Sequence, residues 1–245
     1  MSYQPSTRVL EHIRLNKINV IGITGEMMSG KDTVANFIRF AFCTVTSLKA
    51  FAYPLKQILM DHFGFTWDDV CTTEGKKRFN EFWGMTNREA LQRVGTECFR
   101  NNFHPDTWLK SMELNIMKSN SKLFVISDVR FPNEEQMIHL LGGKVIKVWR
   151  TNIERNGSHM QHASETSIND LQIDASIGNN GTMVELFELV LNVLEEFDIL
   201  DRVPINPAQV GSVPDPSLEE AYFQALLNFT KNDYRLNREF HYRGV

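Results

Sequence analysis

The sequence predicts an α/β fold in which helices cover both faces of a parallel sheet. Short apolar runs that fit buried strands alternate along the chain with segments whose apolar residues recur at helical spacing. The first strand is expected at about 18–24, and a helical pattern follows over 31–42. Strands that alternate with helices usually pair in parallel, so this order favours one sheet between two helical layers.

The same order of elements recurs in the second half of the chain. An apolar run ends at Ser127, Pro132 opens a helix, and the segment 144–150 supplies another strand. A further strand is expected over 171–179, and Thr182 is placed to cap the strongly amphipathic helix that follows it. These elements complete the predicted core.

We divide the chain into a main domain over 1–201 and a C-terminal extension over 202–245. The middle of the main domain, about 54–118, is largely helical and rich in aromatic residues, and it fits an insertion that covers the edge of the sheet. Proline, glycine and serine concentrate in 202–217, as in a linker. The amphipathic segment 218–229 would then pack on the core or on a second copy of the chain in a homodimer.

Size and composition limit the class of protein. The 245 residues fit one large domain, and 42% hydrophobic with 23% charged residues is ordinary for a globular protein. No apolar run approaches the roughly 20 residues of a membrane helix, and the N-terminus lacks the apolar block of a secretory signal. We therefore expect a soluble cytoplasmic protein. A net charge of −4 gives no general attraction to nucleic acid, so we expect a local site for a small phosphorylated ligand.

The segment GEMMSGK, which begins at Gly25, fits a loop that binds phosphate. Gly25, Gly30 and Lys31 have the spacing G-x-x-x-x-G-K between a predicted strand and a predicted helix. Such a loop turns backbone N–H groups, here including those of Met28 and Ser29, toward phosphate oxygens. The helix start adds positive potential, and the lysine reaches the β- and γ-phosphates. The alternative is a glycine turn with a surface lysine.

The residue after the lysine is unusual. Loops of this kind commonly place Ser or Thr there as a ligand of the Mg²⁺ that accompanies the nucleotide, but this chain has Asp32. Asp32 would supply an oxygen ligand directly or through water, while Thr33 would cap the helix or join the metal shell. Two alternatives stay open: Asp32 orients the acceptor group, or it only complements the positive end of the helix dipole.

Asp128 and Arg130 follow the strand that ends at Ser127. A carboxylate at the end of such a strand can face Mg²⁺ or the phosphates beside the loop, which makes Asp128 a further candidate metal ligand. Arg130 offers a bidentate fork to a phosphate. The alternative for Arg130 is a weak surface ion pair with Glu134 or Glu135.

Arg150 ends a predicted strand and opens a polar loop, about 150–166, that contains Arg155, His159 and His162. This loop could close over the reacting phosphates as a small lid and exclude water. No cysteine or dense carboxylate cluster accompanies the histidines, so we expect them to be packed or solvated rather than bound to a metal.

Five sequence segments stand in a specific order along the chain. They are GKDT at 30–33, FAYPLK at 51–56, LQRVGTECFRNNF at 91–103 with Trp108 beyond it, SDVRFPNE at 127–134 and HASE at 162–165. In this order they resemble the deoxynucleoside monophosphate kinases of tailed bacteriophages, within the P-loop nucleoside monophosphate kinase superfamily. The resemblance covers about residues 18–198 and implies that an Asp after the lysine is compatible with activity.

The resemblance implies a P-loop kinase fold with a helical monophosphate-binding insertion and a small lid. ATP with Mg²⁺ would donate the phosphoryl group, and a deoxynucleoside monophosphate would accept it. The acceptor site would be formed by Lys56, Arg88, Gln92, Gly95, Thr96 and Arg130. Gln92 is chemically suited to read a base edge through its amide. The alternative for Arg88 and Gln92, which are four residues apart, is an exposed helix face.

The expected function is therefore ATP-dependent phosphorylation of deoxynucleoside monophosphates to diphosphates for DNA synthesis, in the host cytoplasm if the chain is viral. Lys31, Asp128, Arg130 and Arg150 would serve the reacting phosphates, because phosphoryl transfer needs positioning and charge neutralisation. No general base is required, since the attacking acceptor oxygen is already anionic. Two alternatives stay open: another small-molecule kinase, such as one acting on dephospho-coenzyme A, and a nucleotide-binding module that switches partner binding without catalysis.

Overall fold

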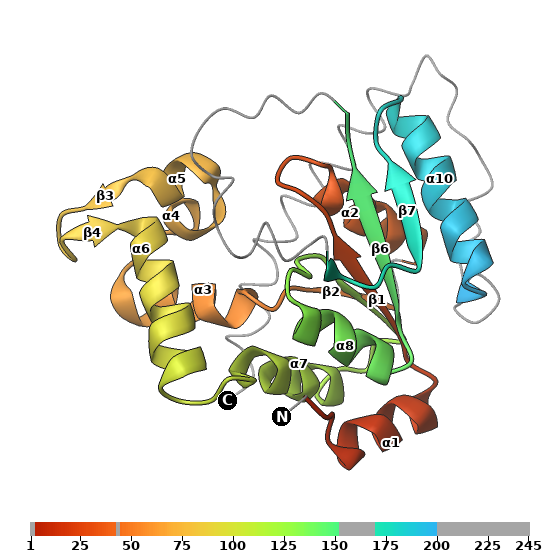
Figure 1. Cartoon of the computed structure of the whole chain (residues 1–245), viewed down its shortest axis with the longest axis horizontal. Helices are drawn as coiled ribbons and strands as arrows, with labels where there is room; N and C mark the ends of the chain where they lie inside the picture. The colour runs from red at the N-terminus through yellow and green to blue at the C-terminus, as the bar shows by residue number, and fades with distance from the viewer. Residues whose placement is uncertain (1–2, 43–44, 152–169, 200–245) are drawn as a thin grey trace.

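The computed structural model describes residues 3–42, 45–151 and 170–199, which contain a five-stranded sheet. Its strand order is β2-β5-β1-β6-β7, and every neighbouring pair is parallel. Figure 1 shows helices on both faces of this sheet, which confirms the predicted α/β class. The strands are β1 (Asn19–Thr24), β2 (Thr46–Lys49), β5 (Leu123–Ile126), β6 (Lys144–Trp149) and β7 (Ala175–Gly178).

The sheet separates two hydrophobic cores. In β5, Phe124 and Ile126 join the core on one face, whereas Leu123 and Val125 join the core on the other, because successive strand side chains point to opposite faces. The first core is covered by α1 (Thr7–Asn16), α7 (Thr107–Met117) and α8 (Pro132–Leu140), and the second by α2 (Lys31–Ala41) and α10 (Met183–Glu196). Within the described ranges, no helix combines the length and apolar character needed to cross a membrane.

The elements next to the glycine-rich segment lie where the sequence predicts them. β1 ends at Thr24 and α2 begins at Lys31. Thr182 caps α10 as predicted: its hydroxyl accepts from the Glu185 N–H, and the Glu185 carboxylate accepts from the Thr182 N–H. This reciprocal pair of hydrogen bonds fixes the start of the helix that covers the second core.

Other element boundaries differ from the sequence-based expectation. β7 covers only part of the predicted 171–179 strand, because the Asp174 carboxylate, rather than a backbone carbonyl, accepts from the Val145 N–H at 2.8 Å. The edge strand β2 and the helix α1 were not predicted. All four residues of β2 are only half-buried, so this short strand carries no apolar run that would reveal it.

An insertion over residues 53–101 lies between β2 and α7 and forms a separate lobe in Figure 1. The helix α7 also falls within the expected range of 54–118, and its buried residues belong to the first core, as do Leu55 and Leu59 of the insertion. The elements of the insertion are α3 (Tyr53–Phe63), α4 (Trp67–Cys71), α5 (Thr73–Lys77), the hairpin β3 (Phe79–Asn80) and β4 (Met85–Thr86), α6 (Asn87–Gln92) and the π-helix η1 (Arg93–Asn101).

A buried asparagine holds the short helices of the insertion together. Asn87 is 1% exposed, and its Nδ2 donates to Asp69 Oδ1 at 2.9 Å and to the Gly75 carbonyl at 2.8 Å. A side chain at Gly75 would approach the Asp68 carbonyl to 1.9 Å, so only glycine permits this contact between α4 and α5. The first residue of α6 thereby sets the position of α5.

The N-terminal segment is attached to α7 by a buried carboxylate. Glu113 accepts hydrogen bonds from the Tyr3 hydroxyl and from Ser6 Oγ, the latter at 2.6 Å. Glu113 and Tyr3 are both buried, and burial together with the Glu113 charge raises the pKa of the Tyr3 hydroxyl. Ser6 also caps α1 by accepting from the Val9 N–H. The contacts of Glu113 thus place the start of α1 on the first core.

We expect Glu113→Ala to lower the free energy of unfolding by about 2–3 kcal/mol, because it leaves the buried Tyr3 hydroxyl and Ser6 without their charged acceptor. Glu188→Ala, which removes an exposed glutamate from α10, should change it by less than about 0.5 kcal/mol. Urea denaturation of both variants measures the difference. If the free energy of unfolding falls by the same small amount in both variants, the Glu113 contacts do not stabilise the fold.

Candidate active site

The candidate site lies at the carboxyl edge of the sheet, where ligands bind in open parallel sheets. The glycine-rich loop follows β1, and β1 lies between β5 and β6. Asp128 follows β5 and Arg150 follows β6, so the strand order places these two predicted residues on either side of the loop. Lys49 ends β2 at the same edge, and burial lowers the pKa of its amine.

The loop between β1 and α2 has the backbone that the glycine spacing predicts. Gly25 and Gly30 have φ angles of 149° and 99°, and Met28 also adopts a positive φ of 65°. A side chain at Gly25 would meet the Val148 carbonyl at 2.2 Å, and one at Gly30 would meet Asn179 Nδ2 at 2.2 Å. Both glycines are therefore required by close contacts with the segments that end β6 and β7.

Asn179 is a site residue that the sequence analysis missed. Its Nδ2 donates to the Ser29 carbonyl at 2.9 Å, and its backbone N–H donates to the Trp149 carbonyl at 2.8 Å. It therefore holds the loop from the side of β7. The available signal was its position at the end of the strand predicted over 171–179, and so at the same edge as the loop. Ser29 itself is fully buried beneath the loop.

The first turn of α2 carries the residues expected to serve nucleotide and metal. Lys31 Nζ donates to the Glu26 carbonyl at 2.7 Å, so the lysine lies across its own loop. Asp32 is exposed and Thr33 is half-buried. In the part of the chain that the structure describes, neither of these two side chains has a hydrogen-bond or ion-pair partner. Their oxygens therefore remain available to a ligand.

Asp128 is bonded to the start of the insertion. Its Oδ1 accepts from the Phe51 N–H at 2.7 Å and its Oδ2 from the Ala52 N–H at 3.0 Å. These residues directly precede α3, which carries Lys56. A carboxylate has about four acceptor positions, so two of them remain for other groups. Asp128 thus fixes the segment that leads to a predicted acceptor-binding residue.

Glu134, an alternative partner of Arg130, forms an ion pair with Arg100 of η1. Its Oε1 accepts from Arg100 Nη2 at 2.9 Å, and its Oε2 accepts from the Arg130 backbone N–H at 2.9 Å. Burial and the nearby Asp128 charge raise the pKa of Glu134 to about 7, against the opposing effect of Arg100 and the backbone N–H. The buried Glu134 thus connects the insertion to the segment that carries Arg130 and does not form a surface ion pair.

Three cations of the insertion and Arg130 of the sheet domain are close enough for their charges to interact. Burial lowers the pKa of Lys76 to about 8, and the positive charges of Lys56, Arg88 and Arg130 lower it further. These cations come from α5, α3, α6 and the segment after β5. Among the described residues, Lys56, Lys76 and Arg88 have no ion-pair partner. The structure therefore brings three predicted acceptor residues together in a positively charged cluster.

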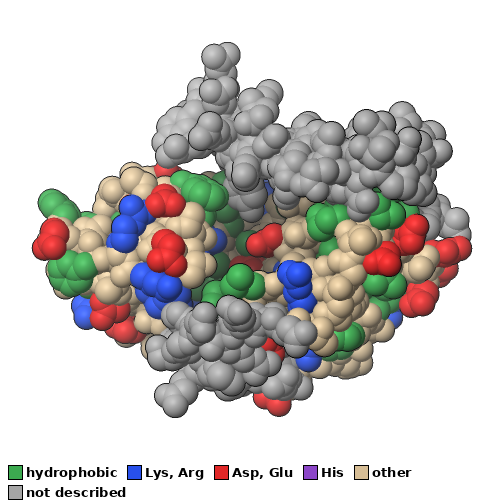
Figure 2. Space-filling model, turned by 90° about the horizontal axis from the view of Figure 1, so that it is seen from above, with side chains coloured by type: hydrophobic (Ala, Val, Ile, Leu, Met, Phe, Trp, Pro, Cys, Tyr) green, Lys and Arg blue, Asp and Glu red, His purple; other side chains and the backbone are tan. Residues whose placement is uncertain are grey.

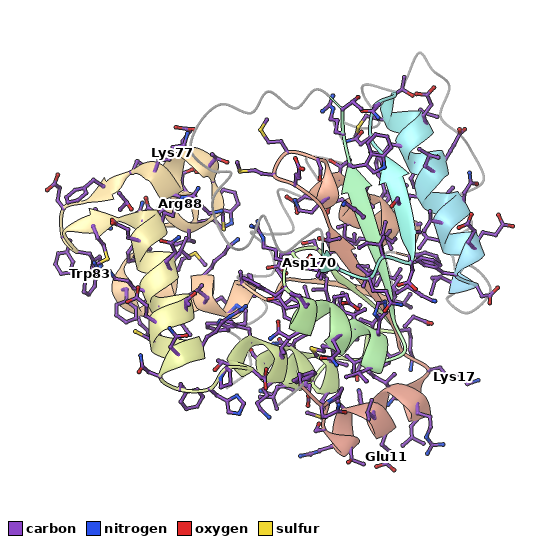
Figure 3. The ribbon with its side chains drawn as sticks, in the orientation of Figure 1. Glu11, Lys17, Lys77, Trp83, Arg88 and Asp170 are labelled. Atoms are coloured by element: carbon purple, nitrogen blue, oxygen red, sulfur yellow. The ribbon has the colours of Figure 1, made fainter. Side chains whose placement is uncertain are left out.

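Lys76 was not predicted from the sequence. It follows Gly75 on α5, and the Asn87 side chain, next to Arg88, bonds the Gly75 carbonyl. Figure 3 shows Arg88 directly beneath α5, on which Lys77 is labelled. From above, the surface is hollowed between the insertion and the sheet, and both acidic and basic side chains border the hollow (Figure 2). A lysine in a five-residue helix gives no periodic signal that would have identified it.

The remaining acceptor predictions have different surroundings. A side chain at Gly95 would approach Leu55 Cδ2 to 2.7 Å, and the Gly95 carbonyl accepts from Trp108 Nε1 at 3.1 Å. Gly95 thus allows η1 to pack closely on α3. Thr96 is exposed, and Gln92 is half-buried at the end of α6.

The predicted lid and C-terminal extension cannot be placed in the same way. Arg150 is exposed after β6, and the next residue, Thr151, donates through its N–H and hydroxyl to Asn180 Oδ1, each at 2.7 Å. The other residues of the predicted lid up to 166, with His159 and His162, and all of the 202–245 extension lie outside the described residues. Within the described ranges, no group of three His, Cys, Asp or Glu side chains is arranged to hold a metal ion.

Comparison with known proteins identifies the family. The family model for deoxynucleotide monophosphate kinase matches residues 74–190. A protein of Acanthamoeba polyphaga mimivirus, provisionally named deoxynucleotide monophosphate kinase, is 30% identical over 193 residues, which cover 72% of this chain and 96% of the relative. The deoxynucleotide monophosphate kinase of Enterobacteria phage T4 is 27% identical over 67% of this chain and 71% of its own.

A solved structure of dephospho-CoA kinase from Campylobacter jejuni is similar at a TM-score of 0.39 and 16% identity, over 73% of this chain and 96% of that one. A score this low carries no argument about function. The sequence match to the mimivirus protein covers 96% of the length of that protein. The chain therefore belongs to the deoxynucleotide monophosphate kinase family.

Proposed function

We propose that this protein transfers the γ-phosphoryl group of ATP to a deoxynucleoside monophosphate and so produces the diphosphate for DNA synthesis. The observation that supports the proposal is that two separate places suit a phosphate group, the loop after β1 and the cation cluster of Lys56, Lys76, Arg88 and Arg130. A switch module needs only the first site. The second fits a phosphorylated acceptor, and membership of the family favours a deoxynucleotide over dephospho-coenzyme A.

The donor site would consist of the loop from Gly25 to Thr33. Its backbone N–H groups and the N-terminus of α2 would hold the phosphates of ATP. Lys31 would leave the Glu26 carbonyl and offset negative charge on the γ-phosphoryl group during transfer. Arg150, from the opposite side of the loop, would add a further positive charge.

The residues at the loop fit a magnesium ion bound with the nucleotide. Asp32 presents a carboxylate in the first turn of α2 with no partner among the described residues, and hard oxygen ligands of this kind suit Mg²⁺. Thr33 and Asp128 are the other candidate ligands, although Asp128 already accepts two backbone N–H groups. The ion would neutralise charge on the β- and γ-phosphates of ATP.

The acceptor would bind with its phosphate in the cation cluster. Lys56, Lys76 and Arg88 would neutralise and orient it, and Arg130, at the edge of the sheet, would lie between acceptor and donor phosphates. The acceptor oxygen that attacks is already anionic, so the site needs alignment rather than a base. Gln92, on the same helix as Arg88, would contact the base.

The experiment that tests the function is a substrate panel. Purified protein is incubated with ATP, Mg²⁺ and each natural deoxynucleoside or ribonucleoside monophosphate, or dephospho-coenzyme A, and ADP is measured by a coupled assay. We expect ADP only when a deoxynucleoside monophosphate is present. Turnover with dephospho-coenzyme A alone, or ATP binding without turnover of any acceptor, would favour one of the two alternatives.

Lys31→Met should fold normally but lower kcat by at least about 100-fold, because the transferring phosphoryl group loses a preorganised positive charge. Lys118→Met, which removes a lysine beyond the end of α7 and away from the carboxyl edge, is the matched control and should retain the wild-type kcat. Wild-type turnover by a folded Lys31→Met variant would contradict the assignment of the loop.

Asp32→Asn should raise the Mg²⁺ concentration needed for half-maximal turnover and lower kcat, since an amide oxygen is a weaker ligand than a carboxylate. Thr33→Ala should have the smaller effect. Titration of turnover with Mg²⁺ at saturating ATP and acceptor separates the two residues. An unchanged Asp32→Asn curve with a shifted Thr33→Ala curve would transfer the metal role to Thr33.

Lys76 should make acceptor binding dependent on pH. Its pKa of about 8 means that the amine is protonated below pH 8 and loses its charge above it, so kcat/KM for the monophosphate should fall as the pH rises through this value. Lys76→Arg keeps the charge and should shift this decline to higher pH. In Lys76→Ala, kcat/KM for the monophosphate should be low at every pH. An alkaline decline that is identical in the wild type and Lys76→Arg would exclude Lys76 as its source.

A further inference from the structure

The insertion is tied to one short segment of the sheet domain at both of its ends. At its start, Asp128 accepts from the backbone N–H groups of Phe51 and Ala52, just before α3. At its end, Glu134 accepts from the guanidinium of Arg100, on the last turn of η1. Both carboxylates belong to the segment 127–134, which also carries Arg130. One segment therefore contacts both the entry and the exit of the lobe that carries Lys56, Lys76 and Arg88, and α7 adds a second contact at the exit through the hydrogen bond from Trp108 to the Gly95 carbonyl.

The contact at the exit is built around a single buried carboxylate. Glu134 Oε1 lies 2.9 Å from Arg100 Nη2, while Oε2 accepts from the N–H groups of Arg130 at 2.9 Å and Phe131 at 3.2 Å. The Glu134 side chain is 3% exposed and that of Arg100 is 23% exposed. Both oxygens are thus used, one for the insertion and one for the backbone of the residue that would contact the acceptor phosphate.

Arg100 makes a second contact with the same segment. Its guanidinium lies over the ring of Phe131, 4.5 Å from the centroid. A planar guanidinium can bond a carboxylate along its edge while it stacks on an aromatic ring, and lysine cannot reproduce both contacts. The two contacts of Arg100 therefore fix both the orientation of η1 relative to the start of α8 and the distance between these two elements.

We infer that Arg100 and Glu134 are positioning residues that hold the acceptor-binding insertion in register with Arg130. This inference rests on the proposed function, because it assigns a role within the acceptor site. Neither side chain needs to touch the substrate. Their contact sets the distance between cations on the insertion and a cation on the sheet, and a phosphate can be held by all of them only when that distance is correct.

The inference predicts a selective defect. Loss of the Arg100 guanidinium removes the contact between the last turn of η1 and the segment 127–134 and leaves a buried carboxylate without its charged partner, while the Trp108 hydrogen bond to the Gly95 carbonyl still holds η1 to α7. Among the described residues, no hydrogen bond or ion pair joins the loop after β1 to Arg100 or Glu134. The KM for the monophosphate should therefore rise, with little change in the affinity for ATP. A defect of general folding would instead affect both substrates.

The test compares Arg100→Ala and Glu134→Gln with Arg78→Ala. Arg78 pairs with Asp68 and Asp69 wholly inside the insertion and is 54% exposed, so its variant removes an arginine–carboxylate pair that does not join the two parts. Glu134→Gln keeps an oxygen for the Arg130 N–H and replaces the oxygen that accepts from Arg100 with an amide NH2 of similar size. It provides a second test if Arg100→Ala fails to fold.

We expect the KM for the monophosphate to rise about tenfold or more in Arg100→Ala and in Glu134→Gln, while their ATP dissociation constants stay within about twofold of wild type. In Arg78→Ala, both the monophosphate KM and the ATP dissociation constant should be unchanged. The double variant should be no worse than the more affected single variant, because both changes remove one contact. Arg100→Lys should restore part of the loss. A monophosphate KM within twofold of wild type in both single variants would overturn the inference, as would an equal loss of ATP affinity.

Amide hydrogen exchange separates this inference from the proposed function. Exchange in residues 53–101 should be faster in Arg100→Ala than in Arg78→Ala, while exchange in β1, β5 and β6 stays at the wild-type rate. This measurement does not require activity. If the wild type phosphorylates no monophosphate, the proposed function fails; if exchange in the insertion is unchanged in Arg100→Ala, the positioning role fails independently.

Discussion

The position of β1 between β5 and β6 is the constraint on which the rest of the site depends. A parallel sheet places the carboxyl ends of its strands at one edge, so the loop after β1 is flanked by the residues that follow its two neighbours. The loop must also pass within contact distance of the Val148 carbonyl and Asn179, which leaves no room for a side chain at Gly25 or Gly30. The glycines are therefore required for packing against the ends of β6 and β7, in addition to the phosphate binding that we propose for the loop.

Two carboxylates beside the candidate site accept hydrogen bonds from backbone N–H groups, and one of them also pairs with an arginine. Asp128 and Glu134 are both near the centre of the site, and both accept backbone N–H groups that fix neighbouring loops. Their spacing of six residues lets one segment contact both ends of the insertion. Asp32 differs, because it is exposed and has no partner in the described ranges. Among these three acidic residues, Asp32 is thus the one whose carboxylate oxygens are not used in hydrogen bonds with other described residues.

The sequence predicts the parts of the structure that depend on local pattern. The strand to Thr24, the helix from Lys31 and the cap at Thr182 follow from apolar periodicity, glycine spacing and capping chemistry, and all are confirmed. The edge strand β2 was missed because its half-buried residues show neither an apolar run nor alternation. Family membership follows from the order of several short motifs, which is more specific than any one of them.

Features that depend on distant contacts could not be read from the chain. Asn179 contacts the loop across 150 residues of sequence, and Asp128 bonds backbone groups 77 and 76 residues away. Arg130 and Glu134 were considered as a possible surface pair, but Glu134 is buried and its guanidinium contact comes from Arg100, 34 residues earlier. The spacing of charges along a sequence does not say which of them become buried, and burial decides their partners and their pKa.

The cation cluster explains why the insertion needs a firm attachment to the sheet. Like charges held close together repel, and burial of Lys76 adds a desolvation cost that lowers its pKa. Without a phosphate, this repulsion favours separation of α3, α5 and α6 from Arg130. The Asn87 contacts hold the helices of the insertion together, whereas Asp128 and Glu134 hold the insertion against the segment of Arg130. If the acceptor binds as proposed, its phosphate would replace this repulsion with attraction, and the contacts of Asp128 and Glu134 would already hold the geometry that the bound acceptor stabilises.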